Sequence, residues 1–272
     1  MSLTSFLETK DVRERFYKEF PKPKFNIKKK ILAPPLTDHY SLVGTAFDYL
    51  LRFYLEYLNP KAVTHKWVAE HVLSCYPSEA RTHLPKVEKI INQAKENHLV
   101  FLRTGELNDE IIKSALLLAQ IDPIFRAGII DKKIGTIDPK DIKDLKQLIT
   151  IVTPDIFKAK KICILNPTFG EACRLVGGAD TDLILDDVIV DIKTTKKLTV
   201  DRYSFNQLIG YYILYKIGGI EGAPQQYKIK KLGIYFSRYA YLYVSDVKDI
   251  VDKKTFPFFI KWFKKKAKEI FL

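Results

Sequence analysis

The chain has 272 residues, enough for one large domain or two modest ones, and its 47% hydrophobic content is ample for a globular core. No apolar run approaches the roughly 18 residues of a membrane-spanning helix. Lysine and arginine outnumber aspartate and glutamate by 45 to 32, and the resulting net charge of +13 favours a polyanionic partner, most commonly nucleic acid. A lysine-rich surface that only maintains solubility is the alternative, and a phospholipid surface is less favoured.

The cysteines and the first residues bear on the cellular compartment. Cys75, Cys163 and Cys173 lie at unrelated spacings with no CxxC pair, which predicts a reducing, cytoplasmic setting and argues against a structural zinc site. The opening MSLTSFLETKDVRER is too polar and too acidic for a secretory signal. No GxxxxGK[ST] phosphate loop is present, so we do not expect ATP hydrolysis within the chain.

The first half of the chain predicts helices. Residues 1–40 read as an irregular lead-in rich in proline and lysine. Apolar residues at helical spacing then predict helices over 42–58 and near 61–75, 78–98 and 108–121. A further helix is expected over 137–152, with Asp138 as its N-cap and Pro139 at its first position.

After Pro154 the sequence changes character. It predicts two strands, a hairpin, a helix and a second hairpin, over 161–165, 171–176, 178–195, 203–217 and 230–244. A basic helix closes the chain. Helices followed by a strand-rich segment with one crossing helix predict an α/β fold, a central mixed β-sheet flanked by helices, with a helical N-terminal region.

The first hairpin, GADTDLILDDVIVDIKTT, places acidic side chains in a segment that otherwise reads as buried strand. A two-residue turn at Asp186–Asp187 sets Asp182 opposite Asp191 and Asp180 opposite Lys193. Because side chains alternate along a strand, these four share one face. The other, core-facing side carries Thr181, Leu183, Leu185, Val188, Val190 and Ile192.

Opposed carboxylates repel each other unless a cation lies between them. Mg²⁺ is a hard ion that commonly uses one or two carboxylates together with substrate phosphate. The hairpin therefore predicts a magnesium site with Lys193 beside it. If the turn were shifted by one residue, the acidic side chains of one strand would lie on the opposite face of the hairpin.

The residues Asp182 and, on the neighbouring strand, Asp191–Ile192–Lys193 resemble the PD-(D/E)XK nuclease superfamily. Gln207 and Tyr211, one turn apart on the next predicted helix, resemble the QxxxY motif of its RecB-like and lambda-exonuclease-like branches. The segment GTAFDYLLRF (44–53) resembles the Gly-opened helix that precedes the core in RecB-like members. The resemblance implies a single nuclease domain, 1–272, with a restriction-endonuclease-like core.

In this domain, residues 42–58 and 154–272 would form the core and residues 60–150 a helical insertion. The chain departs from the family pattern in two places. No Pro–Asp pair precedes the hairpin; the pair Pro154–Asp155 lies upstream and is expected to cap an element. Asp48 stands where RecB-like members often carry a histidine. Asp48, Arg52 and Glu56 share a helical stripe on which ion pairing is the simpler account, and a metal role for Asp48 or Glu56 is the alternative.

The resemblance also implies a ligand set for Mg²⁺ or Mn²⁺. Asp182 and Asp191 would bind the ion, and the carbonyl of Ile192 would add a further oxygen. Asp180 would be either a ligand of a second ion or the true first aspartate. The alternative for Asp180 and Asp182 is that they are hydrogen-bonded strand ends.

The remaining roles concern the substrate. Lys193 would orient or deprotonate the attacking water, or neutralise developing charge. Gln207 would hold Lys193 or a phosphate oxygen, and Tyr211 would contact the phosphate backbone. Lys196 and Lys197 would add nucleic-acid contacts. The simpler alternative is that Lys193 is a surface lysine at the end of a strand and that Gln207 and Tyr211 only pack their helix.

Together these features predict a metal-dependent DNA nuclease, with a RecB-like exonuclease favoured and DNA preferred over RNA. The first alternative is a catalytically degenerate nucleic-acid-binding protein on the same scaffold. The second is a restriction-type endonuclease that acts as a dimer, with residues 60–150 as its recognition part. A further alternative is that the protein is a structural or partner-binding subunit. The sequence does not decide whether it forms a homo-oligomer or binds a partner helicase.

Overall fold

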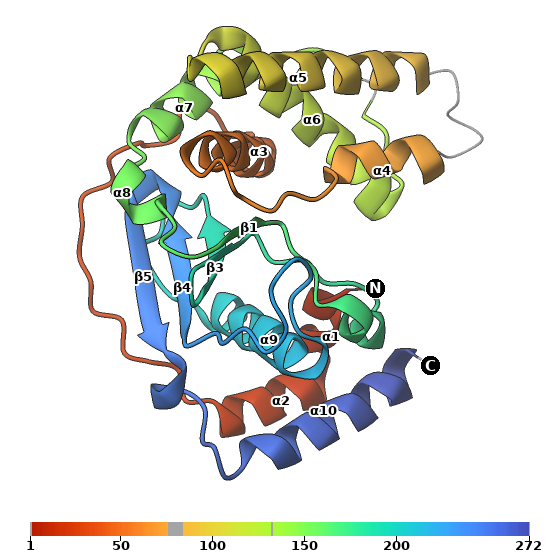
Figure 1. The fold of residues 1–272 in the computed structure, drawn as a ribbon, viewed down its shortest axis with the longest axis vertical. Helices are drawn as coiled ribbons and strands as arrows, with labels where there is room; N and C mark the ends of the chain where they lie inside the picture. Colours follow the sequence, from red (N-terminus) through yellow and green to blue (C-terminus); the bar gives the residue numbers. More distant parts are fainter. Residues whose placement is uncertain (1, 76–83, 132, 272) are drawn as a thin grey trace.

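The computed structural model describes residues 2–75, 84–131 and 133–271, so the start of the helix predicted over 78–98 lies outside the described residues. A five-stranded sheet forms the middle of three layers, with helices on both faces (Figure 1). None of the helices in these ranges has the length and apolar character needed to cross a membrane.

The sheet is mixed and its strands follow chain order. The strands are β1 (Cys163–Leu165), β2 (Leu183–Leu185), β3 (Val188–Lys193), β4 (Lys231–Phe236) and β5 (Tyr241–Asp246). All neighbouring pairs are antiparallel except β3 and β4, which run parallel and are joined by helix α9 (Arg202–Gly218). A parallel pair needs such a crossover, so the central mixed sheet with one crossing helix is confirmed.

The predicted turn of the first hairpin is confirmed, because Leu185 pairs with Val188 and leaves Asp186–Asp187 between the strands. Asp186 has φ 49°, a left-handed conformation that Asp tolerates in tight turns. Its carboxylate accepts hydrogen bonds from the backbone N–H groups of residues 160–162. Burial raises the pKa of Asp186, but these bonds outweigh it and the pKa is lowered. Asp186 therefore anchors the segment before β1.

Both faces of the sheet are buried, whereas the sequence pattern assigned the core to one face. Leu183 and Val190 belong to a core shared with the helices above the sheet. Ile184 and Ile189, on the face that also carries Asp182 and Asp191, pack into a second core with α9. The acids thus lie at the end of a buried face rather than along an exposed one.

The helices above the sheet correspond to those predicted, except that the helix expected near 61–75 begins only at Val68, because Val63 forms a β-bridge with Ile164. They are α3 (Tyr40–Leu58), α4 (Val68–Cys75), α5 (Leu84–Thr104), α6 (Asp109–Ala127) and α7 (Pro139–Thr150). Asp138 caps α7 by accepting from the Lys140 N–H at 2.8 Å, as expected. The Pro154–Asp155 pair opens a short helix, α8 (Pro154–Phe157), and Asp155 is exposed beside Lys158.

Two predictions about the layer below the sheet are wrong. The lead-in is not irregular throughout, because it contains α1 (Leu3–Glu8) and α2 (Lys10–Glu19). Their aromatic residues Phe6 and Phe16 pack edge-on against Phe263 and Phe259 of the closing helix α10 (Phe256–Phe271). This burial stabilises helices whose own sequence signal is weak.

The segment 171–176 lies in a 3₁₀ helix, η2 (Gly170–Val176), and not in a strand. Its buried residues Ala172 and Val176 belong to the same core as α9. Gly218 at the end of α9 permits this approach, because a Cβ there would lie 2.2 Å from the carbonyl oxygen of Phe169. Tertiary packing here overrides the apolar pattern that predicted a strand.

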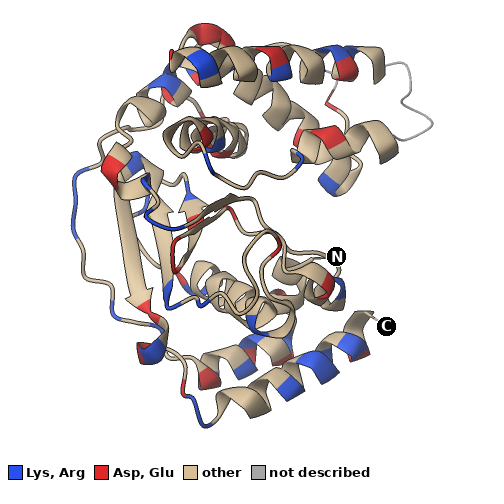
Figure 2. Cartoon of the chain, in the orientation of Figure 1, with Lys and Arg blue, Asp and Glu red and all other residues tan. Residues whose placement is uncertain are grey.

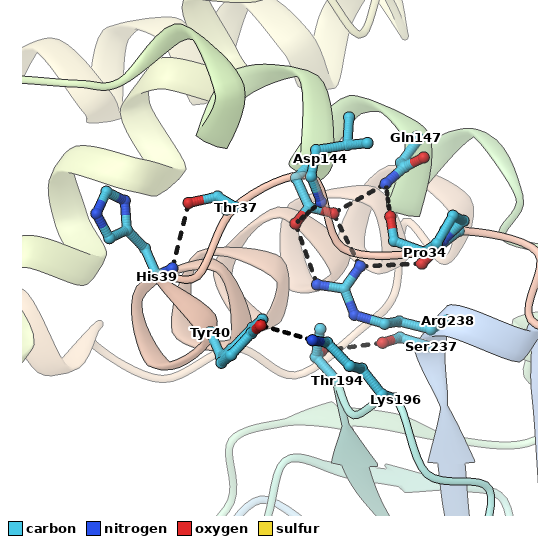
Figure 3. Close-up of polar contacts among 12 residues, drawn as sticks. Pro34, Thr37, His39, Tyr40, Asp144, Gln147, Thr194, Lys196, Ser237 and Arg238 are labelled. Atoms are coloured by element: carbon cyan, nitrogen blue, oxygen red, sulfur yellow. Dashed lines mark hydrogen bonds and ion pairs between the residues drawn. The ribbon is translucent and has the colours of Figure 1, made fainter.

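A buried ion pair joins the upper helices to the sheet (Figure 3). Arg238, in the connection between β4 and β5, donates to Asp144 of α7 at 2.8 Å, and both side chains are fully buried. Arg238 also donates to the carbonyl of Ala33 at 2.9 Å. Its neighbour Ser237 donates to the Thr194 hydroxyl at 2.9 Å, just after β3. The end of β3 is therefore tied to α7 through this connection.

Candidate active site

A pocket of about 240 Å³ lies at the ends of β2 and β3, beside α9. Its wall brings together every predicted catalytic and metal-binding residue: Asp180, Asp182, Asp191, Ile192, Lys193, Gln207 and Tyr211. Residues Ser2–Thr4, Gly178, Ala179 and Arg126 complete it. The hairpin and the first half of α9 thus converge as the sequence pattern predicted.

A chain of polar contacts runs through the pocket from β3 to α9. The Lys193 ammonium lies 2.9 Å from the Oδ2 of Asp191, and it donates to the Oε1 of Gln207 at 2.9 Å. Gln207 in turn donates from Nε2 to the Tyr211 hydroxyl at 2.8 Å. Gln207 was predicted to hold either Lys193 or a phosphate oxygen, and the structure shows it bonded to Lys193.

The electrostatics of this chain set the protonation states. Burial lowers the pKa of Lys193, but Asp191 and Asp182 outweigh it and the net pKa is raised. Burial also raises the pKa of Tyr211 well above its usual value. Both side chains therefore keep their protons at neutral pH, so Lys193 is suited to orienting a water or neutralising charge rather than to accepting a proton.

The two hairpin aspartates lie side by side. Asp182 accepts from the Ile192 N–H at 2.6 Å, while Asp191 is only 2% exposed. Burial raises the pKa of Asp182 well above its ordinary value, and repulsion from Asp48 and Asp191 adds to it. The pKa of Asp191 is raised by burial too, although Lys193 opposes the shift. This is the crowding of negative charge that the sequence predicted.

Asp48 of α3 joins this acidic cluster from the layer above the sheet. It forms the expected ion pair with Arg52 at 2.6 Å, yet its Oδ1 is buried without a hydrogen-bond partner. Its charge raises the pKa of both Asp182 and Asp191. Glu56, the other residue of that stripe considered for a metal role, instead lies 3.3 Å from the Nε2 of His98. Of the two, Asp48 is the one placed to act in the site.

Asp180 and Arg126 form the outer wall of the pocket. The Asp180 carboxylate was expected opposite Lys193, but the partner found for it is Arg126 of α6, at 3.4 Å. Arg126 also lies 3.6 Å from Asp122, one turn earlier on the same helix. Burial raises the pKa of Asp122 to about 6. Nothing in the sequence near residue 126 indicated a role in this site.

The two lysines predicted to contact nucleic acid lie outside the pocket wall. Lys196 is exposed and donates to the Tyr40 hydroxyl at 2.6 Å, with its ammonium over the same ring. Lys197 is exposed, and its backbone N–H bonds to the Thr195 hydroxyl. Their contact with nucleic acid stays a prediction.

The donors present suit a hard divalent cation. In the part of the chain that the structure describes, no three His, Cys, Asp or Glu side chains form a preformed metal centre. However, Asp48 Oδ1 is buried without a hydrogen-bond partner, and Asp191 Oδ2 is buried with the Lys193 ammonium 2.9 Å away. Buried carboxylate oxygens of this kind fit Mg²⁺ or Mn²⁺, which complete their shell with water and phosphate oxygens.

Comparison of the chain with protein-family models, with curated proteins and with solved structures finds no match. The function of the site is therefore argued from its geometry and charge.

Proposed function

We propose that this protein is a metal-dependent nuclease that hydrolyses phosphodiester bonds, with DNA as the preferred substrate and a site of the PD-(D/E)XK type. The observation that carries the proposal is the contact chain from Asp191 through Lys193 and Gln207 to Tyr211, in one pocket with Asp182. Its order along β3 and α9 corresponds to the D…DxK and QxxxY pattern. The mixed sheet with its α9 crossover suits a restriction-endonuclease-like core.

The distribution of charge supports a polyanionic substrate. Figure 2 shows lysines and arginines along the segment before α3 and along α10. With a net charge of +13, the protein attracts nucleic acid over long range. The acidic cluster in the pocket would repel the same substrate unless a divalent cation neutralised it, which is consistent with a metal-dependent reaction.

Each residue then has a defined task. Asp182 and Asp191 would hold a Mg²⁺ or Mn²⁺ ion, and the Ile192 carbonyl and the unbonded Oδ1 of Asp48 would be further oxygens for it. When bound, the ion lowers the pKa of a water molecule and neutralises charge on the phosphate. Lys193, held as an ammonium, donates to the attacking water or to a non-bridging phosphate oxygen.

The α9 residues position this lysine. Gln207 accepts from Lys193 and donates to Tyr211, which restricts the ammonium to one orientation. Since the raised pKa of Tyr211 keeps its hydroxyl protonated, that hydroxyl can donate to a phosphate oxygen of the backbone. The RecB-like branch is favoured because this pair lies on α9 as the QxxxY motif requires.

The test is a cleavage assay with Mg²⁺ or Mn²⁺ on end-labelled linear and circular DNA. Lys193→Ala and Asp191→Ala each remove a charge at the reacting phosphate, so we expect each to lower the cleavage rate by about 10²–10³-fold. Asp155→Asn, which alters the exposed Pro–Asp pair, is the control and should cleave like the parent.

Cleavage of linear but not circular DNA would identify an exonuclease, and cleavage of both an endonuclease. If the two pocket variants cut as fast as the parent, the site assignment is wrong. Salt-sensitive DNA binding with no cleavage by the parent would favour the catalytically degenerate alternative.

A further inference from the structure

Arg126 is a cation at the mouth of the pocket that the hairpin motif does not include. It lies in the last turn of α6, within the helical segment 60–150 that was predicted to be an insertion into the core. Its side chain is 52% exposed, and its guanidinium meets Asp180 at 3.4 Å and Asp122 at 3.6 Å. Both distances are long for a charged pair, so the guanidinium is held loosely.

Among the residues that the structure describes, Arg126 and Lys193 are the cationic side chains that line the pocket. Lys193 is committed to Asp191 and Gln207, and its side chain is only 26% exposed. Arginine carries five N–H donors in a planar fork that matches two phosphate oxygens at once. Arg126 therefore keeps free donors for an anion that enters from solvent.

The position of Arg126 relates the pocket to a second hollow. A groove of about 1100 Å³ lies along α3, α6 and the start of α7, and Arg126 lines both this groove and the 240 Å³ pocket. Because Arg126 lines both hollows, it lies at the edge of the pocket and not beside the reacting centre. Arg126 is thus placed to contact the part of a polymeric substrate next to the reacting bond.

We infer that Arg126 binds a backbone phosphate of the nucleic-acid substrate adjacent to the scissile one, and that Asp180 holds the guanidinium in place until this phosphate replaces it. The inference rests on the proposed function and adds a substrate-binding residue from the helical segment. It also gives Asp180 the role of partner to Arg126 instead of metal ligand. A bidentate arginine–phosphate contact is stronger than the loose pair with Asp180, so the exchange is favourable.

The test measures binding of a fluorescent single-stranded oligonucleotide by anisotropy over a salt series, with Ca²⁺ in place of Mg²⁺. Arg126→Ala should weaken binding and reduce the slope of log K against log salt by about 1, as expected for one lost phosphate contact. Arg126→Lys keeps the charge but lacks the planar fork of donors, so its affinity should lie between those of the parent and Arg126→Ala. Arg174→Ala is the matched control, because Arg174 is also an exposed arginine paired with a carboxylate, Glu171, at 3.0 Å.

The same variants are then compared in catalysis. Arg126→Ala should raise KM for DNA, while hydrolysis of the small diester bis(p-nitrophenyl) phosphate stays at the parent rate. A salt slope for Arg126→Ala equal to that of the parent and of Arg174→Ala would overturn the inference. An equal loss on DNA and on the small diester would do so too, because it would indicate damage to the reacting centre.

Asp180→Asn separates the two roles of Asp180. It should bind the oligonucleotide at least as tightly as the parent, since it releases Arg126 for the phosphate. Weaker binding by Asp180→Asn than by the parent would overturn the assigned role and return Asp180 to the metal site. Because the salt series needs no turnover, a parent that binds but does not cut would contradict the proposed function while the contact of Arg126 is still measured.

Discussion

The two halves of the molecule contribute to the pocket in different ways. The sheet half, β1–β5 with α9, supplies Asp182, Asp191 and Lys193 from one hairpin and Gln207 from the next helix. The helical half, α3–α7, supplies Arg126 to the pocket wall, and its Asp48 acts on Asp182 through its charge. Strand pairing determines the positions of the residues from the sheet half, whereas the packing of the helices on the sheet determines the positions of those from the helical half.

The halves also differ in how they treat buried charge. The ion pair between Asp144 and Arg238 is fully buried, and each partner satisfies the other. Asp182, Asp191 and Asp48 repel one another, and burial raises the pKa of each. The molecule thus pairs one acid with one base where the halves join, whereas at the pocket three acids crowd together although Lys193 and Arg52 pair with two of them, as expected of a functional site.

The largest effect is expected at the join between the halves. Arg238→Ala leaves Asp144 as an unpaired buried charge, which should lower the free energy of unfolding by about 3–5 kcal/mol. Urea unfolding monitored by circular dichroism measures this. The double variant Arg238→Met with Asp144→Leu removes both charges and should recover most of the loss. If Arg238→Ala alone unfolds at the parent urea midpoint, this pair does not hold the halves together.

The difference between the halves also explains what sequence could predict. The turn at Asp186–Asp187 and the alternation of strand residues placed Asp182, Asp191 and Lys193 correctly, because the register of a hairpin follows from its turn. The position of Gln207 followed from helical periodicity. Arg126 left no such signal, since its approach to Asp180 depends on how α6 packs over the sheet.

The errors in the fold prediction have the same origin. The helices α1 and α2 were missed because their stability comes from aromatic contacts with α10, at the far end of the chain. The segment 171–176 was taken for a strand because its apolar residues pack against α9, at a glycine that permits close approach. Short elements fixed by distant partners carry little local signal.

The second expected effect concerns a buried carboxylate of the helical half, Asp122, which lies 3.6 Å from Arg126. Burial raises the pKa of Asp122 to about 6, so its carboxylate destabilises the folded state above that pH and not below its unfolded pKa of 3.8. Asp122→Asn keeps an acceptor for the Tyr49 hydroxyl and should raise the free energy of unfolding by up to about 3 kcal/mol at neutral pH.

Unfolding at a series of pH values checks this expectation. The gain of Asp122→Asn should be absent near pH 3.5, grow as the pH rises and level off above about pH 6. The exposed control Asp155→Asn should show no such trend. A gain that is the same at every pH would mean that the charge of Asp122 is not its cause.

A smaller effect should distinguish two acids on α3. Asp48 would offer the cation a buried carboxylate oxygen that has no hydrogen-bond partner, so we expect Asp48→Asn to lower the cleavage rate at limiting Mg²⁺ by about 10–100-fold. Glu56→Gln, two turns along the same helix beside His98, is the matched control and should leave the rate unchanged. Equal rates for the two variants would restrict the metal site to the sheet half.

The central claim, that these aspartates hold one divalent cation, is tested most directly by titrating the metal-free protein with Mn²⁺ in a calorimeter at about pH 6 and pH 8. The raised pKa values of Asp182 and Asp191 predict that the parent binds more tightly at the higher pH and releases protons. Asp182→Asn should weaken binding by about 10–100-fold or more, while Asp155→Asn matches the parent. Equal Mn²⁺ affinity in Asp182→Asn and the parent would contradict the account.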